Sequence, residues 1–311
     1  MPLAVAALSH APSFGNVDPG GTTMAEIETA IGEVRSFVEN FDPEVVVVFG
    51  PDHFNGHLYS LITPWAVGAE AVGVGDYGTT EGPIPVDAET ARALHALILE
   101  QGIDIGRSEK MTIDHGILQP IEFIYGHPLT RPIVPIFVNS LGHPLTPMQR
   151  VRLFGEAVGR AAQQLDKRVL LVASGGISHN PPVPRWDDAP EPVRRRLVEY
   201  APSREERAAR EQAIVKGIQA IADGKASGEP LNEAWDTLVL NAFRSGNLAA
   251  VDSWDNDWFI AEGGSAAHEM RSWIAAYAAL STAGPYRLTV DHYWAVETWG
   301  AGFGIQAAIG A

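Results

Sequence analysis

The 311-residue chain contains no cysteine. This absence excludes disulfide bonds, a thiolate nucleophile, and the cysteine ligands of structural zinc and iron-sulfur sites. Any metal ion bound by this protein must therefore be held by histidine and carboxylate side chains.

Basic residues are also scarce, because 22 Lys and Arg stand against 38 Asp and Glu and give a net charge of −16. Nucleic acids and anionic membranes are bound by clustered Lys and Arg, and the one basic run here, residues 194–196, is short. We therefore expect neither nucleic acid nor a membrane as a partner. A small anionic substrate is still compatible with this charge, since one well-placed Arg suffices to bind it.

Long apolar runs are missing as well. The N-terminus has no basic region, and its apolar run, residues 2–9, is too short for a signal or membrane segment. We therefore expect a soluble, cytoplasmic protein. With 46% hydrophobic and 19% charged residues, the chain can bury a sizeable core, and we expect one large domain over residues 1–311.

Short apolar runs alternate with helical patterns along most of the chain. The four valines 45–48, followed by Phe49 and bounded by Gly50-Pro51, are typical of a strand buried on both faces. Further strands are predicted at 2–9, 132–138 and 168–174. Apolar residues recur every three to four positions over 24–41 and 148–165, which predicts amphipathic helices. The predicted fold class is α/β, a largely parallel central sheet flanked by helices, with a helical C-terminal part over 194–246 and 266–280.

The segment 56–85 is rich in glycine and has no clear period. We expect a functional loop here, with one short strand near 58–62. Beyond it, the sequence predicts a helix over 87–100, a short strand over 104–109, and His115 at a turn before a helical stretch over 118–125. The segment 286–304 is aromatic and Gly-rich, and its first half alternates like a strand.

Four of the ten histidines follow strand-like or turn-like segments. His10 and His53 come just after the first two predicted strands, His179 follows the strand 168–174, and His115 follows 111–114. Carboxyl ends of parallel strands meet at the sheet edge where ligands bind, so we expect these four side chains to lie close together. The other six carry no such signal and are interpreted as structural or exposed: His57, His95, His127, His143, His268 and His292.

Two neutral imidazoles and one carboxylate form the facial triad that binds Fe(II) and leaves positions open for substrate and dioxygen. His10 and His53 could supply the imidazoles, and zinc with a bound hydroxide is the alternative on the same ligands. His115 and His179 would then be available for proton transfer. Spacing alone does not select the carboxylate among the candidates Asp18, Asp52, Asp114, Glu122 and Glu269.

Five short motifs occur in one order along the chain: Leu8-Ser9-His10-Ala11-Pro12, Gly50-Pro51-Asp52-His53-Phe54-Asn55-Gly56, Asp114-His115-Gly116, Gly175-Gly176-Ile177-Ser178-His179 and Ala267-His268-Glu269-Met270. In these motifs the chain resembles the class III extradiol ring-cleavage dioxygenases, and among them the group that cleaves 2,3-dihydroxyphenylpropionate. The resemblance covers nearly the whole chain.

The resemblance implies an Fe(II) ion held by His10, His53 and Glu269, and so supplies the carboxylate that spacing leaves open. It implies His115 and His179 as the acid-base pair, with Asp114 as a supporting group for His115. The implied reaction opens a catechol ring with dioxygen, most simply on 3-(2,3-dihydroxyphenyl)propionate or 2,3-dihydroxycinnamate, in the degradation of aromatic compounds. A homo-oligomer is implied too. The alternatives are the same chemistry on a biaryl or unsubstituted catechol, a zinc-dependent hydrolase, and a non-catalytic binding relative.

Overall fold

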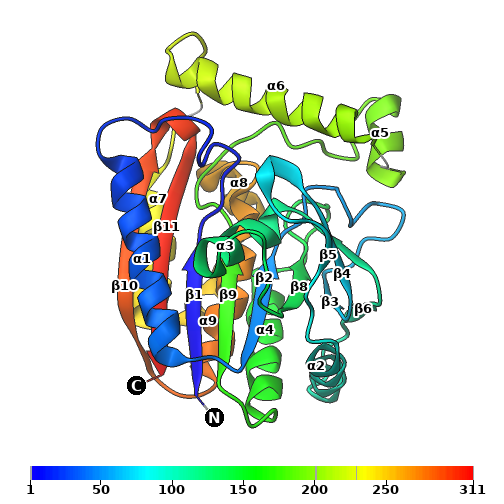
Figure 1. Cartoon of the computed structure of the whole chain (residues 1–311), viewed down its shortest axis with the longest axis vertical. Coiled ribbons are helices and arrows are strands. Elements are labelled where there is room, and N and C mark those ends of the chain that lie inside the picture. The colour runs from blue at the N-terminus through cyan, green and yellow to red at the C-terminus, as the bar shows by residue number, and fades with distance from the viewer. Residues whose placement is uncertain (1, 200–201, 229, 311) are drawn as a thin grey trace.

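The computed structural model describes residues 2–199, 202–228 and 230–310, and its centre is an eight-stranded mixed sheet (Figure 1). Four parallel strands form the middle of this sheet in the order β1, β9, β2, β8. They are β1 (Leu3–Leu8), β2 (Val45–Gly50), β8 (Val134–Val138) and β9 (Val169–Ser174). All four strands were predicted, and every residue in them is buried, which explains why their sequences are apolar without alternation.

Shorter or antiparallel strands extend the sheet on both sides. On one side β11 (Ala301–Gly310) pairs antiparallel with β1, and β10 (Tyr286–Val296) pairs with β11. On the other side β3 (Trp65–Gly68) pairs antiparallel with β8 and parallel with β6 (Gly106–Ser108). A separate three-stranded sheet consists of β4 (Ala71–Val74), β5 (Glu81–Ile84) and β7 (Met111–Ile113).

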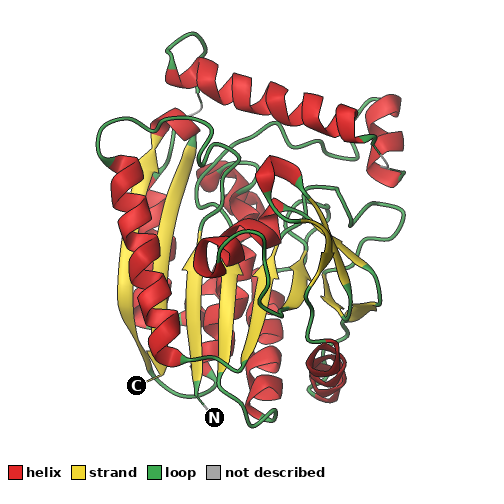
Figure 2. Cartoon of the chain, in the orientation of Figure 1, coloured by secondary structure: helices red, strands yellow, loops and turns green. Residues whose placement is uncertain are grey.

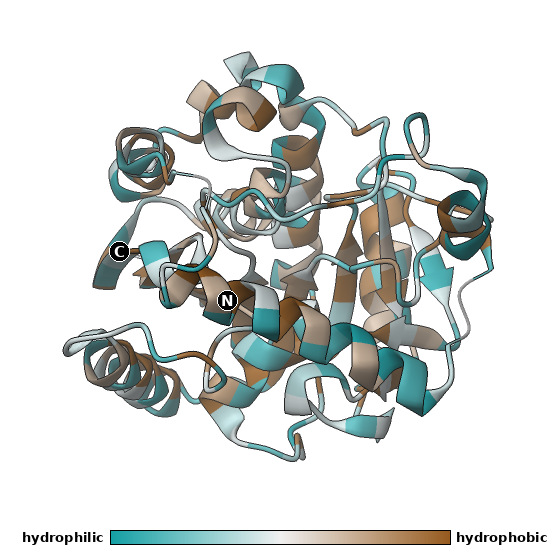
Figure 3. Ribbon diagram, turned by 90° about the horizontal axis from the view of Figure 1, so that it is seen from above, coloured by the Kyte–Doolittle hydropathy of each residue, from teal (hydrophilic) through white to brown (hydrophobic). Residues whose placement is uncertain are grey.

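Helices cover both faces of the main sheet (Figure 2). One face packs against α2 (Ala88–Glu100), α4 (Met148–Gln163), α7 (Glu233–Ser245) and α9 (Met270–Ser281), and the other against α1 (Thr23–Phe41) and α3 (His115–Tyr125). Alternate residues of a strand serve the two cores: Val45 and Val47 belong to the first, Val46 and Val48 to the second. Hydrophobic residues accordingly gather between the layers (Figure 3).

The predicted helical C-terminal part is confirmed and is completed by the β10–β11 hairpin. It also contains α5 (Glu191–Val198), α6 (Arg204–Ala222) and α8 (Asn256–Gly263). The described residues also form four short 3-10 turns: η1 (Asp76–Gly78), η2 (Leu248–Ser253), η3 (Ala267–Glu269) and η4 (Glu297–Trp299). Helix α6 lies across the carboxyl ends of the parallel strands and contacts η1 and η4 (Figure 1). Within the described ranges, no helix has the length and apolar character needed to cross a bilayer.

Two of the local predictions were wrong. Residues 58–62 form a turn and no strand, and the strands of this segment, β3 to β5, come later. Gly73, Gly82 and Pro83 occupy β4 and β5 and hide the alternation by which strands are recognised. His115 does not precede the helix but opens it, because the Asp114 carboxylate accepts the backbone N–H of Gly116 and caps α3.

Candidate active site

His10 lies two residues beyond β1, at the edge where the parallel strands end. Because Leu8 of β1 is in register with Ser174, the last residue of β9, the His10 ring lies beside the Ser174 hydroxyl, and its Nδ1 shares a 2.9 Å hydrogen bond with Ser174 Oγ. Burial lowers the pKa of His10 to about 3, although Glu269 opposes this shift. The ring is therefore neutral at pH 7, and its Nε2 faces the other site residues, 3.5 Å from Glu269 Oε2.

His53 lies three residues beyond β2 and is held by the buried Asp114. Its backbone N–H and its ring Nδ1–H both donate to Asp114 Oδ2, at 2.8 and 3.2 Å. Asn55 Nδ2 donates to the same oxygen at 2.8 Å. Burial opposes ionisation of Asp114, but the attraction and hydrogen bond of His53 prevail and hold its pKa well below the usual range. Asp114 therefore fixes the His53 ring with Nε2 directed toward the site.

Glu269 lies at the junction of η3 and α9, and its side chain is 1% exposed. Its Oε1 is 3.2 Å from His53 Nε2 and 3.4 Å from His179 Nε2, and its Oε2 is 3.5 Å from His10 Nε2. Burial disfavours its charge, but the neighbouring His10 and His179 lower its pKa well below the ordinary value. A single buried carboxylate thus lies among the Nε2 atoms of three imidazoles.

Gly175 and Gly176 make this approach sterically feasible. A Cβ on Gly175 would lie 2.7 Å from the backbone oxygen of Glu269, and a Cβ on Gly176 would lie 2.8 Å from Cε1 of His179. Gly175 also has a φ of 146°, which L side chains rarely adopt. The backbone N–H of Gly176 donates to Glu269 Oε2 at 2.9 Å. The sharp turn after β9 therefore brings Glu269 and His179 together.

His179 and His115 face the same centre from different elements. His179 follows β9, and its Nδ1–H donates to the carbonyl of Ile177 at 3.1 Å. His115 opens α3, and its ring stacks on His53 with 4.2 Å between centroids. The ring of His115 also lies edge to face with His10 at 5.2 Å. All four histidines that follow the strand ends are thus neighbours, as their positions in the sequence indicate.

Asp114 was expected to support His115, but in the structure its carboxylate contacts His53. The carboxylate on His115 belongs to Asp76, whose Oδ2 accepts from His115 Nδ1–H at 2.5 Å and whose Oδ1 accepts from the backbone N–H at 2.9 Å. Asp76 lies in the Gly-rich segment that was interpreted as a loop, and no spacing or periodicity there marks it. Sequence reasoning missed it for that reason.

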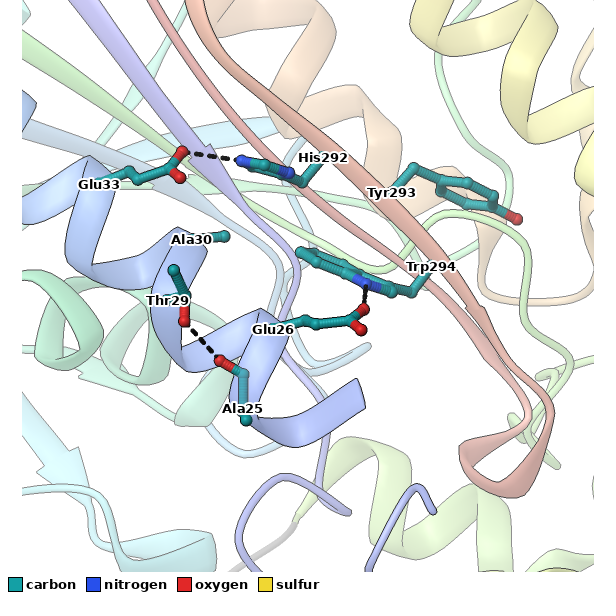
Figure 4. A pocket seen from close by; sticks show the side chains of 8 residues that line it. All are labelled: Ala25, Glu26, Thr29, Ala30, Glu33, His292, Tyr293 and Trp294. Atoms are coloured by element: carbon teal, nitrogen blue, oxygen red, sulfur yellow. Dashed lines mark hydrogen bonds and ion pairs between the residues drawn. The ribbon is translucent and has the colours of Figure 1, made fainter. Parts of the chain in front are cut away.

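The remaining carboxylate candidates lie elsewhere. Asp18 is exposed, and Glu122 accepts the N–H and hydroxyl of Thr80. Asp52 is buried but accepts three backbone N–H groups of its own loop, those of residues 55–57. The six other histidines also stay outside the cluster. His292, for example, lies in a surface groove between α1 and β10, where its Nε2–H donates to Glu33 at 2.8 Å (Figure 4).

The donor chemistry of the cluster fits a divalent metal ion. His10, His53 and His115 each offer a ring nitrogen within 4.8 Å of the others, and Glu269 adds an oxygen at 3.2 to 3.5 Å from the first two. Imidazole and carboxylate ligands suit iron, zinc and related ions. Asp76, Asp114 and His115 also lie within 4.8 Å, but both of these carboxylates already accept backbone and ring N–H groups.

Comparison with known proteins assigns the class. Residues 4–304 match the family described as the catalytic LigB subunit of aromatic ring-opening dioxygenase, and the chain belongs to this family. It is therefore an oxidoreductase of the ring-opening type. The chain is 48% identical over 310 residues to a 2,3-dihydroxyphenylpropionate/2,3-dihydroxicinnamic acid 1,2-dioxygenase of a Rhodococcus species, with 99% of each chain covered. Proteins of the same name from Rhodococcus jostii and Cupriavidus pinatubonensis are 46% and 42% identical over 99% of this chain, and 99% and 98% of their own lengths are covered.

Proposed function

We propose that this protein is a non-haem, Fe(II)-dependent extradiol dioxygenase acting on 3-(2,3-dihydroxyphenyl)propionate or 2,3-dihydroxycinnamate. The observation that carries the proposal is the carboxylate of Glu269, buried among the Nε2 atoms of His10, His53 and His179. The substrate is taken from the names of relatives that are 42–48% identical over nearly the full chain. In this proposal residues 1–311 form one catalytic domain.

His10, His53 and Glu269 would hold the metal ion. These two imidazoles and one carboxylate are the donor set of facial-triad iron sites, which keep open positions for other ligands. Bound Fe(II) would supply a centre at which the two catechol oxygens and dioxygen are held together. Ser174 and Asp114 bind the far nitrogens of the two histidines and would fix their orientation toward the ion.

His179 would remove a proton from the catechol. Its Nδ1–H is committed to the carbonyl of Ile177, which leaves the lone pair on Nε2, the atom that faces Glu269. A hydroxyl group bound beside Glu269 would therefore meet a proton acceptor. General base catalysis of this kind contributes about 10²- to 10⁴-fold in rate.

His115 would deliver a proton to the oxygen that leaves the ring carbon during ring opening. Its Nδ1–H is committed to Asp76, so its Nε2 is the atom available for transfer. Its ring stacks on His53, so it lies close to the proposed ligands, and in this proposal His115 is not itself one of them. Both oxygen atoms of dioxygen end in the open-chain product.

Iron content and turnover of four variants test this division of roles. His115→Gln and His179→Gln should each lower kcat by about 10²- to 10⁴-fold while one Fe(II) stays bound per chain, because neither is a ligand in this proposal. His10→Ala and Glu269→Ala should lose the iron. Metal analysis after anaerobic loading, dioxygen uptake and the yellow ring-opened product are the measurements. Loss of iron from both Gln variants would refute the assignment.

The substrate proposal has its own test. The iron-loaded protein should give a yellow product with 3-(2,3-dihydroxyphenyl)propionate and air. If this substrate gives no yellow product but biaryl or unsubstituted catechols do, the proposed reaction is supported and the proposed substrate is wrong. Zinc in the native protein, with no turnover of any catechol by the iron-loaded form, would favour a hydrolase. We also propose that the protein is cytoplasmic and that it forms a homo-oligomer. Size-exclusion chromatography with light scattering would measure the oligomeric state.

A further inference from the structure

The carboxylate of Asp76 is bound to His115 at two points. Its Oδ1 accepts the backbone N–H of His115 at 2.9 Å, and its Oδ2 accepts the ring Nδ1–H at 2.5 Å. Both side chains are only 4% exposed. The ring of Tyr77 lies edge to face over the imidazole, with 4.7 Å between centroids. One face of His115 stacks on His53, so the ring is enclosed by Asp76, Tyr77 and His53.

The turn that carries Asp76 has an unusual backbone. Tyr77 has a φ of 47°, and Gly75 and Gly78, its neighbours on either side of the turn, have φ of 75° and 80°. A non-glycine residue in this left-handed region is strained and persists only where its surroundings enforce it. Such strain gathers at functional sites, and the strained Tyr77 therefore points to a role for Asp76, the residue beside it.

Helix α6 holds the strained turn in place, and α3 binds the segment that follows it. From α6, Glu211 Oε2 accepts the N–H of Tyr77 at 3.2 Å, and Arg207 donates to the carbonyl of Val74. From α3, Glu122 accepts the N–H of Thr80 at 2.9 Å. The position of Asp76 is therefore determined by contacts from outside the turn, and α6, which covers the carboxyl ends of the strands, is one of their sources.

This arrangement fixes one tautomer of His115. Because Asp76 Oδ2 can only accept, the ring keeps its proton on Nδ1, and Nε2 is free to gain and lose a proton. The second contact, to the backbone N–H, prevents the carboxylate from rotating away. A carboxylate behind an imidazole acts in the same way in other enzymes, where it sets tautomer and orientation without itself transferring a proton.

We propose that Asp76 is a positioning residue for proton transfer by His115. This inference rests on the proposed function, in which His115 is the proton donor. In this proposal, the Gly75–Gly78 turn and its contacts with α6 keep His115 Nε2 directed at the substrate. Among the described residues, the Asp76 carboxylate accepts hydrogen bonds from His115 and Thr79, and none from the proposed metal ligands His10 and Glu269.

Asp76→Asn is the discriminating variant. One amide atom must still accept the backbone N–H of His115, so the amide oxygen takes that place and the NH2 group faces Nδ1. The NH2 group then donates to Nδ1 of His115, so the proton of the neutral ring moves to Nε2. In this tautomer Nε2 can no longer take up a proton and pass it on to the substrate. We expect kcat to fall by about 10- to 100-fold, with KM within about twofold and with unchanged iron content.

Glu122→Gln is the matched control, because Glu122 binds Thr80, which lies beyond the turn, and an amide oxygen can still accept there; Glu122 does not hydrogen-bond to His115. It should keep kcat within about twofold. Asp76→Glu keeps a carboxylate and should recover part of the lost kcat. It tests the proposal even if Asp76→Asn folds poorly. Thermal melting of each variant reports whether it is folded.

A second measurement does not depend on turnover. In the metal-free protein, labelled on histidine, the short bond to Asp76 should give a strongly deshielded Nδ1–H proton resonance that disappears in Asp76→Asn and persists in Glu122→Gln. Equal kcat losses in the Asn and Gln variants, or a kcat of Asp76→Asn within twofold of the wild type, would overturn the proposal. A wild-type protein that shows the resonance but turns over no catechol would refute the proposed function instead, and the role of Asp76 in catalysis with it.

Discussion

Asp114→Asn measures what the buried carboxylate behind His53 contributes to metal binding. Two oxygens of Asp114 accept four hydrogen bonds, from the backbone and ring of His53, from Asn55 and from the N–H of Gly116. The amide introduced by this substitution has one oxygen. We expect that oxygen to take the place of Oδ2, where it still accepts from the backbone and ring of His53 and from Asn55. The NH2 group then faces the N–H of Gly116, so at least one bond to a charged acceptor is lost, worth about 1.5–3 kcal/mol.

The expected effect on metal affinity follows from the same contacts. The hydrogen bond of His53 Nδ1–H is no longer charge-assisted, so Nε2 becomes a weaker ligand. Loss of such an outer partner costs about 10- to 100-fold in affinity, which is about 1.4–2.8 kcal/mol. Anaerobic Fe(II) titration against a competing chelator would measure the dissociation constant, and circular dichroism would show that the variant is folded.

Asp52→Asn is the control for removing a buried carboxylate from the same region. Asp52 accepts only backbone N–H groups of its loop, and burial together with the charge of Asp114 raises its pKa well above the ordinary value. An amide should therefore replace it with less than about threefold change in Fe(II) affinity, an expectation based on its lack of contact with a ligand side chain. If Asp114→Asn binds Fe(II) as tightly as Asp52→Asn, the reasoning about His53 is wrong.

Three further outcomes are expected. Gly159→Ala should lower the free energy of unfolding by about 1–3 kcal/mol in urea titrations, because its Cβ would lie 2.3 Å from the Ala279 oxygen of α9; an unchanged midpoint would contradict this packing. The hydrogen bond of Arg152 lowers the pKa of Asp252, so this pair stabilises the fold above pH of about 4, and its contribution disappears as the pH falls through the lowered value. Asp252→Asn should therefore cost about 0.5–1 kcal/mol at pH 7 and nothing at low pH, whereas a cost that persists in acid would refute the ion pair. Chelation of the metal ion should lower the melting temperature, since a ligand at 100 times its dissociation constant adds about 2.7 kcal/mol; equal melting with and without chelator would show that no metal binds.

The sequence predicts the central sheet well because its strands are buried on both faces. The valines of β2 and the apolar run of β9 leave no other interpretation, and the histidines that follow them mark one edge. His115 follows β7 of the separate three-stranded sheet and opens α3, so the main sheet does not place it, but the grouping of His10, His53 and His179 follows from this topology. Glu269 does not, because it lies at the start of a helix that packs under the site from the C-terminal part of the chain, and only the family resemblance selected it.

Asp76 and the turn at 58–62 show where sequence reasoning fails. In the segment 56–85 the conformation is decided by distant partners: Tyr59 N–H donates to the carbonyl of Leu197, and Tyr77 N–H donates to Glu211. Long-range contacts of this kind produce no periodic pattern in the local sequence. The contact between Asp76 and His115 could not be predicted for the same reason. The supporting role was instead predicted for Asp114, because Asp114 precedes His115 directly in the sequence.

The position of β1 has a consequence for how the protein is made. This first strand is hydrogen-bonded to β9 on one side and to β11, which ends at Gly310, on the other. Because both partners come much later in the sequence, the two edges of β1 stay unpaired during folding until β9 and β11 have been made. His10 follows β1, and Glu269 comes from a much later part of the sequence, so these two side chains also meet only through long-range packing. The candidate active site therefore depends on contacts between segments that lie far apart in the sequence.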